Sequence, residues 1–420
     1  MKFNVKWLAS LILIILTCLF ESKGYAIPAF ARREGVSCVT CHTNGSAPRL
    51  TRYGYEYRRA GFRDPDQIGK VEVDEKAMTI GSHMSANINI DYEYVTEKPV
   101  GGSEGVTSNQ FNSPGFALWP ANGGFMGNFG TWVEVDMNFG TTGGAGSASL
   151  STGDVRYVTG SADFFFSIRS GVLAGEGFGA SDQWLDDANV PLIDSENANY
   201  NQDTLALPLG PMTMSQLGTE FGLTSHNTNL TFGIYNGLDG AANGGSGTAA
   251  TVQPALMHKN KDTKFQLDQF IGDRAAITAI YYDGYIPLLD PTNTTLWNSH
   301  YSLARLYGTL SITRSIDLML GSQYGWFDYV SSSGNGNFNN RGGFIGATWA
   351  VSDKLTLASR IDYINYNLSS SQGTPKANGF SVQASVPVNK TSIFVARLNN
   401  TSSDLTGVTD DARVEWRFLF

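Results

Sequence analysis

The chain has 420 residues, a formal net charge of −9 and three cysteines. Its 47 glycines and many aromatic residues (24 Phe, 18 Tyr, 8 Trp), with only 16% charged residues, are typical of an all-β chain with many turns and unusual for a soluble α/β enzyme. After residue 26 no run of 18 apolar residues occurs, so no transmembrane helix is expected.

Residues 1–26 have the pattern of a secretory signal. Lys2 and Lys6 form a charged start, and the run from Leu8 to Phe20 is largely apolar and 13 residues long. Such a run is too short to span a membrane as a helix. We expect cleavage after Ala26, which would leave only the second and third cysteines of the chain, too few for a disulfide scaffold.

Both remaining cysteines belong to one motif, Cys38-Val39-Thr40-Cys41-His42. In a C-x-x-C-H run the two thiolates add to the vinyl groups of a haem, and the adjacent imidazole becomes an axial ligand of the iron. The alternatives are a disulfide, a redox pair and a zinc site. A zinc site would need a further Cys or His cluster, whereas the next histidine, His83, lies 41 residues on. The motif predicts one covalent haem c.

Residues 27–63 form a short basic stretch, with seven arginines against two glutamates. Thr51 precedes a run rich in Arg and Tyr that Gly61 closes, which predicts a short capped helix. Four side chains share one face of this helix and would cover haem or barrel wall: Leu50, Tyr53, Tyr57 and Ala60. About 40 residues are too few to bury a core alone, so either the covalent haem forms part of that core or the stretch rests against something larger. The opposite charge of the rest of the chain favours docking this stretch inside it.

The motifs of this stretch resemble a known family. The run Pro-Ala-Phe-Ala-Arg, the C-x-x-C-H motif and the later spacing Pro-x-Leu-x-x-x-Gly-x-x-Tyr-x-x-x-Gly-Phe are similar to the monohaem outer-membrane cytochrome c–porin fusions of iron-oxidising bacteria. The resemblance covers residues 27–63 at the level of motifs. It implies a signal peptide (1–26), a haem-binding plug (27–70) and an outer-membrane β-barrel (71–420).

The remainder of the chain alternates between apolar and polar residues, as β-strands do. In the first such stretch, 78–95, Met84, Ala86, Ile88 and Ile90 share one face, while His83, Asn87, Asn89, Asp91 and Glu93 share the other. Similar stretches, which predict further strands, lie at 129–139, 162–174, 217–223, 230–235, 306–312, 318–329, 344–350, 355–368, 380–386, 393–398 and 414–420. The last of these ends on Phe420, as the final strand of an outer-membrane barrel does.

Connections of two lengths separate the predicted strands. Turns are predicted at 272–274, 351–354 and 388–390, and long loops rich in Gly, Asn and Ser at 97–115, 140–153, 175–214, 239–251, 331–340 and 369–378. Short turns on one side and long loops on the other are the layout of bacterial barrels. The fold predicted is an all-β, 16-stranded (or 14-stranded) transmembrane barrel in the outer-membrane lipid, with a short c-type haem segment plugging the lumen.

The iron has one predicted axial ligand, His42, and several candidates for the other side. His83 is the first choice, because it shares the face of the first strand that should line the lumen; Met78 is the second. The alternative is that His83 only lines the lumen. Three further histidines lie in or near predicted loops and are weaker candidates: His226, His258 and His300.

No nucleophile–base pair, phosphate-binding loop or nucleic-acid surface is found, so no catalytic side chain is predicted. A haem with two protein ligands transfers electrons. The resemblance implies an extracellular Fe(II):cytochrome c oxidoreductase, which takes electrons from Fe(II) and passes them to a periplasmic c-type cytochrome. The alternatives are an outward conduit to extracellular acceptors and a diffusion porin with a structural or sensory haem.

Overall fold

The computed structural model describes residues 28–42, 50–70, 83–101, 105–112, 114–125, 127–138, 147–174, 215–236, 261–289, 296–331, 334–352, 354–368, 374–389, 392–404 and 407–419. The predicted signal (1–26), Met78 and the predicted loops 175–214 and 239–251 lie outside these residues. No helix in the described ranges is long and apolar enough to cross a membrane.

Short helices come first in the described chain and antiparallel strands follow. The helical part comprises α2 (Pro28–Glu34), α3 (Cys38–Cys41), α4 (Arg52–Arg59) and the 3₁₀ helix η2 (Pro65–Gln67). The strands are β1 (Ser85–Lys98), β2 (Val106–Phe111), β3 (Gly115–Trp119), β4 (Gly123–Phe125), β5 (Phe129–Asn138), β6 (Ser147–Gly160), β7 (Phe164–Ala174), β8 (Ser215–Ser225), β9 (Thr228–Tyr235), β10 (Asp262–Ile271), β11 (Ala275–Leu289), β12 (Leu296–Ser311), β13 (Ile316–Ser331), β14 (Gly334–Ser352), β15 (Leu355–Leu368), β16 (Lys376–Asn389), β17 (Ser392–Ser403) and β18 (Gly407–Leu419).

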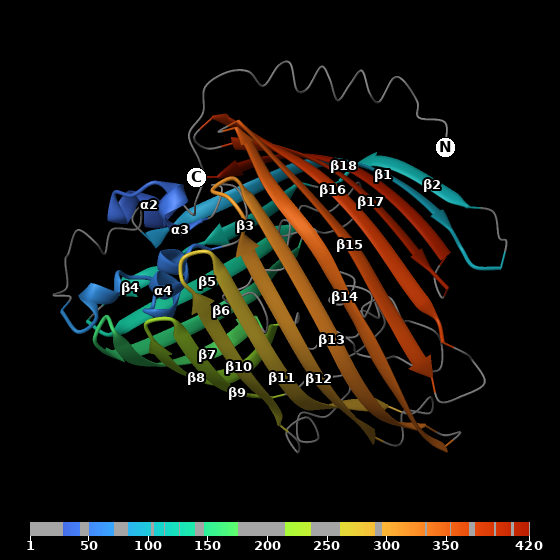
Figure 1. The fold of residues 1–420 in the computed structure, drawn as a ribbon, viewed down its shortest axis with the longest axis horizontal. Helices are drawn as coiled ribbons and strands as arrows, with labels where there is room; N and C mark the ends of the chain where they lie inside the picture. The colour runs from blue at the N-terminus through green and yellow to red at the C-terminus, as the bar shows by residue number, and fades with distance from the viewer. Residues whose placement is uncertain are drawn as a thin grey trace.

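These strands close into one antiparallel barrel (Figure 1). From β5 to β18 each strand pairs with the next, and β18 pairs back with β1, from Asn87 opposite Leu419 to Lys98 opposite Val408. The short strands β2 and β3 both pair with β1, while β3 and β4 both pair with β5, so all three occupy one position in the ring. The described barrel therefore has 16 positions, and the count preferred over 14 is confirmed.

The barrel is apolar outside and polar inside. On β10, Phe265 and Leu267 are 55% and 40% exposed, whereas Lys264 and Asp268 are completely buried. Met84, just before β1, and Ile90 on β1 lie on the exposed side, as predicted, and Asp91 is buried. A soluble sandwich has the opposite distribution, because it buries its apolar faces. An apolar outer face around a polar interior is the arrangement of a barrel that spans a bilayer.

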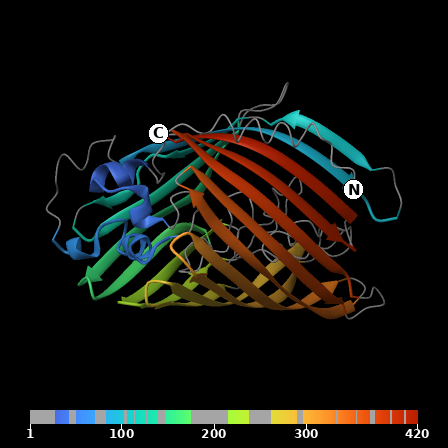
Figure 2. The same cartoon turned by 45° about the horizontal axis from the view of Figure 1, so that its top comes forward.

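The described short turns all lie at the same end of the barrel. They follow alternate strands, at 161–163, 226–227, 272–274 and 312–315, and the turn predicted at 272–274 is confirmed. The helices α2, α3 and α4 lie at one end of the barrel in both views (Figures 1 and 2). This is the short-turn end, because Arg52 at the start of α4 donates to the carbonyl of His226.

Several predicted loops are wrong in part, because strands run into them. β2 lies within the predicted loop 97–115, β6 begins at Ser147, β14 at Gly334 and β16 at Lys376. Residues Gly334–Asn340 pair with β13 although their sequence is rich in Gly and Asn. Strand ends that extend past the apolar band need no apolar alternation. Their Gly- and Asn-rich composition therefore predicted loops where the structure has strands. The sequence pattern predicts no strand within 262–289, where β10 and β11 lie.

Candidate functional site

Helix α4 forms as predicted and is tied to the C-x-x-C-H turn. The hydroxyl of Thr51 accepts from the Gly54 amide (3.1 Å) and donates to the carbonyl of Thr40 (2.7 Å). Gly61 follows the helix with φ +77°, a conformation that glycine adopts without strain. A Cβ on Gly54 would lie 2.8 Å from the carbonyl carbon of Cys41. The two helices therefore pack with backbone almost in contact.

The buried face of α4 differs partly from the predicted one. Tyr57 and Ala60 are buried as predicted, whereas Tyr53 is half-buried. Tyr55 and Arg59, which were not predicted to be buried, are 2% and 6% exposed. The apolar spacing did not identify them, because each is buried through a polar contact with the barrel.

Asp268 on β10 is the main partner of α4. Its carboxylate accepts from the phenol of Tyr55 (2.6 Å) and from the guanidinium of Arg59 (3.2 Å). The Tyr55 ring also packs edge-on against Phe270, with 5.3 Å between centroids. Burial raises the pKa of the Tyr55 phenol well above its usual value, so this phenol stays protonated and able to donate. A buried ion pair thus joins the N-terminal segment (residues 28–70) to the barrel wall.

A row of ion pairs lines the inner wall beside Arg59. Arg156 pairs with Asp154 (2.7 Å), Arg169 with Glu220 (2.5 Å), and Lys264 with Glu220 (2.5 Å). Their side chains are at most 5% exposed. This charge row, on β6, β7, β8 and β10, was not foreseen, because its members come from strands far apart in the sequence. Arg156 also donates to the carbonyl of Arg58 (2.8 Å), a second link to α4.

The structure brings together three of the predicted site residues. Cys38 and Cys41 begin and end the single turn α3, and His42 follows at once, paired with Leu50 in an isolated bridge. Cys41 and His42 are half-buried. Within the described ranges, no group of three or more His, Cys, Asp or Glu side chains is arranged to hold a metal ion.

His83 lies just before β1, on the inner side of the barrel. Its carbonyl accepts from the amide of Asn122 (2.9 Å), and a Cβ on Gly123 would lie 2.9 Å from its ring. This position agrees with the prediction that His83 faces the lumen; its role as a ligand stays a prediction. Met78, the second choice, lies outside the described residues.

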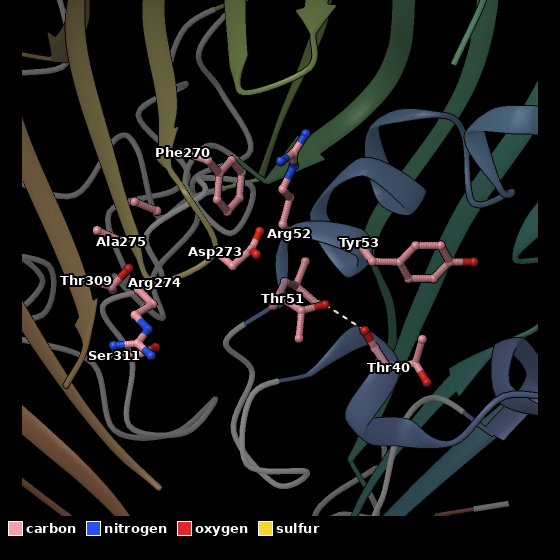
Figure 3. Close-up of a pocket in the computed structure, with 12 residues that line it drawn as sticks. Thr40, Thr51, Arg52, Tyr53, Phe270, Asp273, Arg274, Ala275, Thr309 and Ser311 are labelled. Carbon is pink, nitrogen blue, oxygen red and sulfur yellow. Dashed lines mark hydrogen bonds between the residues drawn. The ribbon is translucent and has the colours of Figure 1, made fainter. Parts of the chain in front are cut away.

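A cavity of about 300 Å³ separates the haem-type motif from the barrel wall (Figure 3). One side is lined by Thr40, Leu50, Thr51, Arg52 and Tyr53, and the other by Phe270, Asp273, Arg274, Ala275, Ala276, Thr309 and Ser311. The second group surrounds the turn between β10 and β11. The cavity is therefore at the short-turn end, directly beside α3.

Aromatic rings on the opposite side of α4 form a stack that leads to the wall. Phe30 stacks on Phe62 and Phe62 on Trp132 of β5, each with 5.2 Å between centroids, and Tyr57 meets Phe30 edge-on. This aromatic stack gives the N-terminal segment a flat apolar surface next to α2.

Comparison with known proteins identifies proteins of the same fold but no family to which the chain can be assigned. No family model and no curated protein matches the chain. Among solved structures, the chain is similar to the outer membrane channel DcaP of Acinetobacter baumannii, with TM-score 0.53, 9% identity, and 80% of this chain and 96% of that one covered. It is also similar to an anion-selective porin from Comamonas acidovorans (0.52, 12%, 80% and 98%) and to Salmonella typhi OmpF in complex with daunomycin (0.53, 10%, 80% and 97%). At these identities the likeness shows a porin-type barrel fold.

Proposed function

We propose that this chain is an outer-membrane monohaem cytochrome–porin that takes electrons from extracellular Fe(II) and passes them to a periplasmic c-type cytochrome. The observation that supports it is the position of the C-x-x-C-H turn. This turn sits on a segment joined to the inner wall of a porin-type barrel by the buried Arg59–Asp268 pair. Short turns of bacterial barrels face the periplasm, so the motif would lie near a periplasmic acceptor.

The residues of the motif fit a covalent haem. The two cysteines at the ends of one helical turn and the histidine that follows them are the donor set for thioether attachment and axial ligation. A haem attached at this motif would supply one-electron transfer. Cys38 and Cys41 would hold it, His42 would ligate its iron, and His83 remains the proposed second ligand.

The position of the C-x-x-C-H motif near the short turns indicates from which end of the barrel the electron donor would approach. An extracellular donor would approach from the long-loop end, since α2, α3 and α4 lie at the other end (Figure 2). Fe(II) would then enter the barrel and be oxidised within it, close to the haem, by outer-sphere transfer, for which no tight iron site is needed. The net charge of −9 attracts a cationic electron donor more strongly than an anionic one.

The test is anaerobic stopped-flow mixing of the oxidised, haem-loaded protein in detergent with Fe(II), following the reduced α-band. Rapid reduction supports Fe(II) as the donor. A protein that dithionite reduces readily and Fe(II) does not would overturn that part of the proposal and favour an outward conduit. Absence of covalent haem from protein made with the haem-attachment machinery would overturn the cytochrome itself.

A diffusion porin is the second candidate function. The observation that favours it is the fold likeness to an anion-selective porin and to a channel protein. Against it stands the packing of α4 on the inner wall, where Tyr55, Arg59 and Asp268 are all buried. Conductance in a planar bilayer separates the two functions, because a diffusion porin conducts ions and a plugged barrel does not.

A further inference from the structure

Two arginines of the N-terminal segment meet at one place on the barrel wall, beside His83. A Cβ on Gly123 would collide with Nη1 of Arg33, and a Cβ on Gly124 would lie 2.8 Å from Nε of Arg63. Gly123 has φ +140°, and neither glycine places a side chain between the guanidinium groups and the wall. We name these four residues, Arg33, Arg63, Gly123 and Gly124, the arginine cradle.

The cradle has more buried donor groups than acceptors in the part of the chain that the structure describes. Arg63 is 2% exposed; its Nη2 donates to the carbonyl of Phe129, whereas its buried Nε and Nη1 have no acceptor there. Arg33 uses Nη2 for the Tyr57 hydroxyl and the Phe62 carbonyl and Nε for Glu34, and its buried Nη1 also has no acceptor. Buried cationic donors without acceptors are costly, which indicates a missing anion.

The excess positive charge of the cradle also indicates a missing anion. Among the described residues, Glu34 is the carboxylate bonded to Arg33, at 3.0 Å, and it also accepts from the Tyr57 hydroxyl. Burial and the neighbouring charge of Arg33 lower the pKa of Arg63 to about 10, the direction expected for a buried cation that lacks a counter-charge. An anion held by both guanidinium groups would relieve both effects.

The surroundings distinguish between kinds of anion. The Phe30–Phe62–Trp132 stack lies against the cradle, with the Arg33 guanidinium 5.5 Å from the Phe30 ring centroid. A small inorganic anion would gain nothing from this flat apolar surface. A planar apolar molecule with carboxylates on one edge would use the rings and the guanidinium groups together, and arginine binds carboxylates through paired donors.

We propose that the arginine cradle binds the propionate carboxylates of the haem attached at Cys38 and Cys41. This inference rests on the proposed cytochrome function, but not on Fe(II) as its donor. Arg63 holds one carboxylate through Nε and Nη1, and Arg33 holds the other through Nη1. The haem edge opposite its thioether links then lies beside His83, at the wall formed by β4.

The test compares haem-loaded Arg63→Gln and Arg33→Gln proteins with wild type by resonance Raman spectroscopy and redox titration. In both variants we expect the propionate bending band to move to lower frequency, because its hydrogen bonds are lost. The midpoint potential should fall, because a buried positive charge that favours the ferrous state is removed. Arg63→Lys should recover the potential in part but not the band, since lysine keeps the charge without the paired donors.

Arg52→Gln is the matched control, because Arg52 lies on the same segment but pairs with Glu56 and is partly exposed. It should leave band and potential unchanged. Cradle variants that behave like Arg52→Gln would overturn the proposal. A different outcome would assign the cradle to a free oxyanion instead. In that case inorganic phosphate at constant ionic strength would stabilise the wild-type protein but not Arg63→Gln, and the propionate band would be the same in both proteins. A shifted band in a protein that Fe(II) fails to reduce would keep the cradle and overturn only the donor.

Discussion

Single side chains decide how the N-terminal segment is held. Asp268 accepts hydrogen bonds from Tyr55, Arg59, Asn229, Gln266 and Thr278, so one carboxylate organises contacts from the segment and three strands. Because it is completely buried, these bonds are not in competition with water. A carboxylate with so many donors is a structural anchor.

Asp268→Ala should therefore destabilise the protein strongly. It leaves the Arg59 guanidinium buried without its partner, and breaking a buried pair in this way costs about 3–5 kcal/mol. Glu56→Ala is the control, because the Arg52–Glu56 pair is a partly exposed i,i+4 pair worth about 0.3–0.5 kcal/mol. Urea titration of the protein in lipid vesicles, followed by tryptophan fluorescence, measures both. Equal losses in the two variants would contradict the anchor.

Glycines of the inner wall make room for large rings. Tyr235 is 1% exposed and stacks on Tyr282, with 5.9 Å between centroids. A Cβ on Gly233 would lie 2.6 Å from its hydroxyl oxygen, and a Cβ on Gly218 2.5 Å from its ring. The ring thus lies along the wall, where its hydroxyl donates to Glu220 of the charge row.

Gly233→Ala should push this ring off Glu220, at an overpacking cost of about 1–3 kcal/mol. The matched control is Gly308→Ala, where the new Cβ would meet only the Leu320 side chain at an ordinary 3.4 Å. The same urea titration should show a loss for the first variant and almost none for the second. If Gly308→Ala is as costly, the effect comes from glycine in strands generally.

At the scale of elements, local chemistry predicted more than long-range packing did. Thr51 and Gly61 marked the ends of α4 correctly, because capping depends on neighbours in sequence. Alternation located most strands and the inward face of β1. It did not reveal that Arg59 of α4 meets Asp268 of β10, because no local pattern records a contact between residues 209 apart. For the same reason, the charge row and the arginine cradle could be found only in the fold.

Thr51 links two elements, so its replacement should loosen both. Thr51→Ala removes the N-cap bond of α4 and the bond to Thr40 of α3, and a lost N-cap alone costs about 0.5–2 kcal/mol. Thr51→Ser keeps the hydroxyl and should behave like wild type. Hydrogen–deuterium exchange of a peptide covering 51–60 should be faster only in the alanine variant. Fast exchange in the serine variant would show that the methyl group, not the hydroxyl, secures the helix.

At the scale of the whole molecule, the barrel is a closed ring and the N-terminal segment is joined to its inner wall. The ring is complete because β18 pairs with β1, and α4 is joined to the wall through Asp268 and through Arg156. Lys264 and Asp268 of β10 are both completely buried.

Wild-type protein in a planar bilayer should therefore conduct far less than an open 16-stranded porin, whose lumen is a water-filled channel. The variant Arg59→Ala with Asp268→Ala removes the buried pair without leaving either charge unpaired, so α4 can leave the wall and conductance should rise. The Arg52→Gln protein is the control, since its side chain is partly exposed, and it should stay closed. High conductance already in wild type, unchanged by the double variant, would show that ions pass α4 freely and would favour the diffusion porin over the electron conduit.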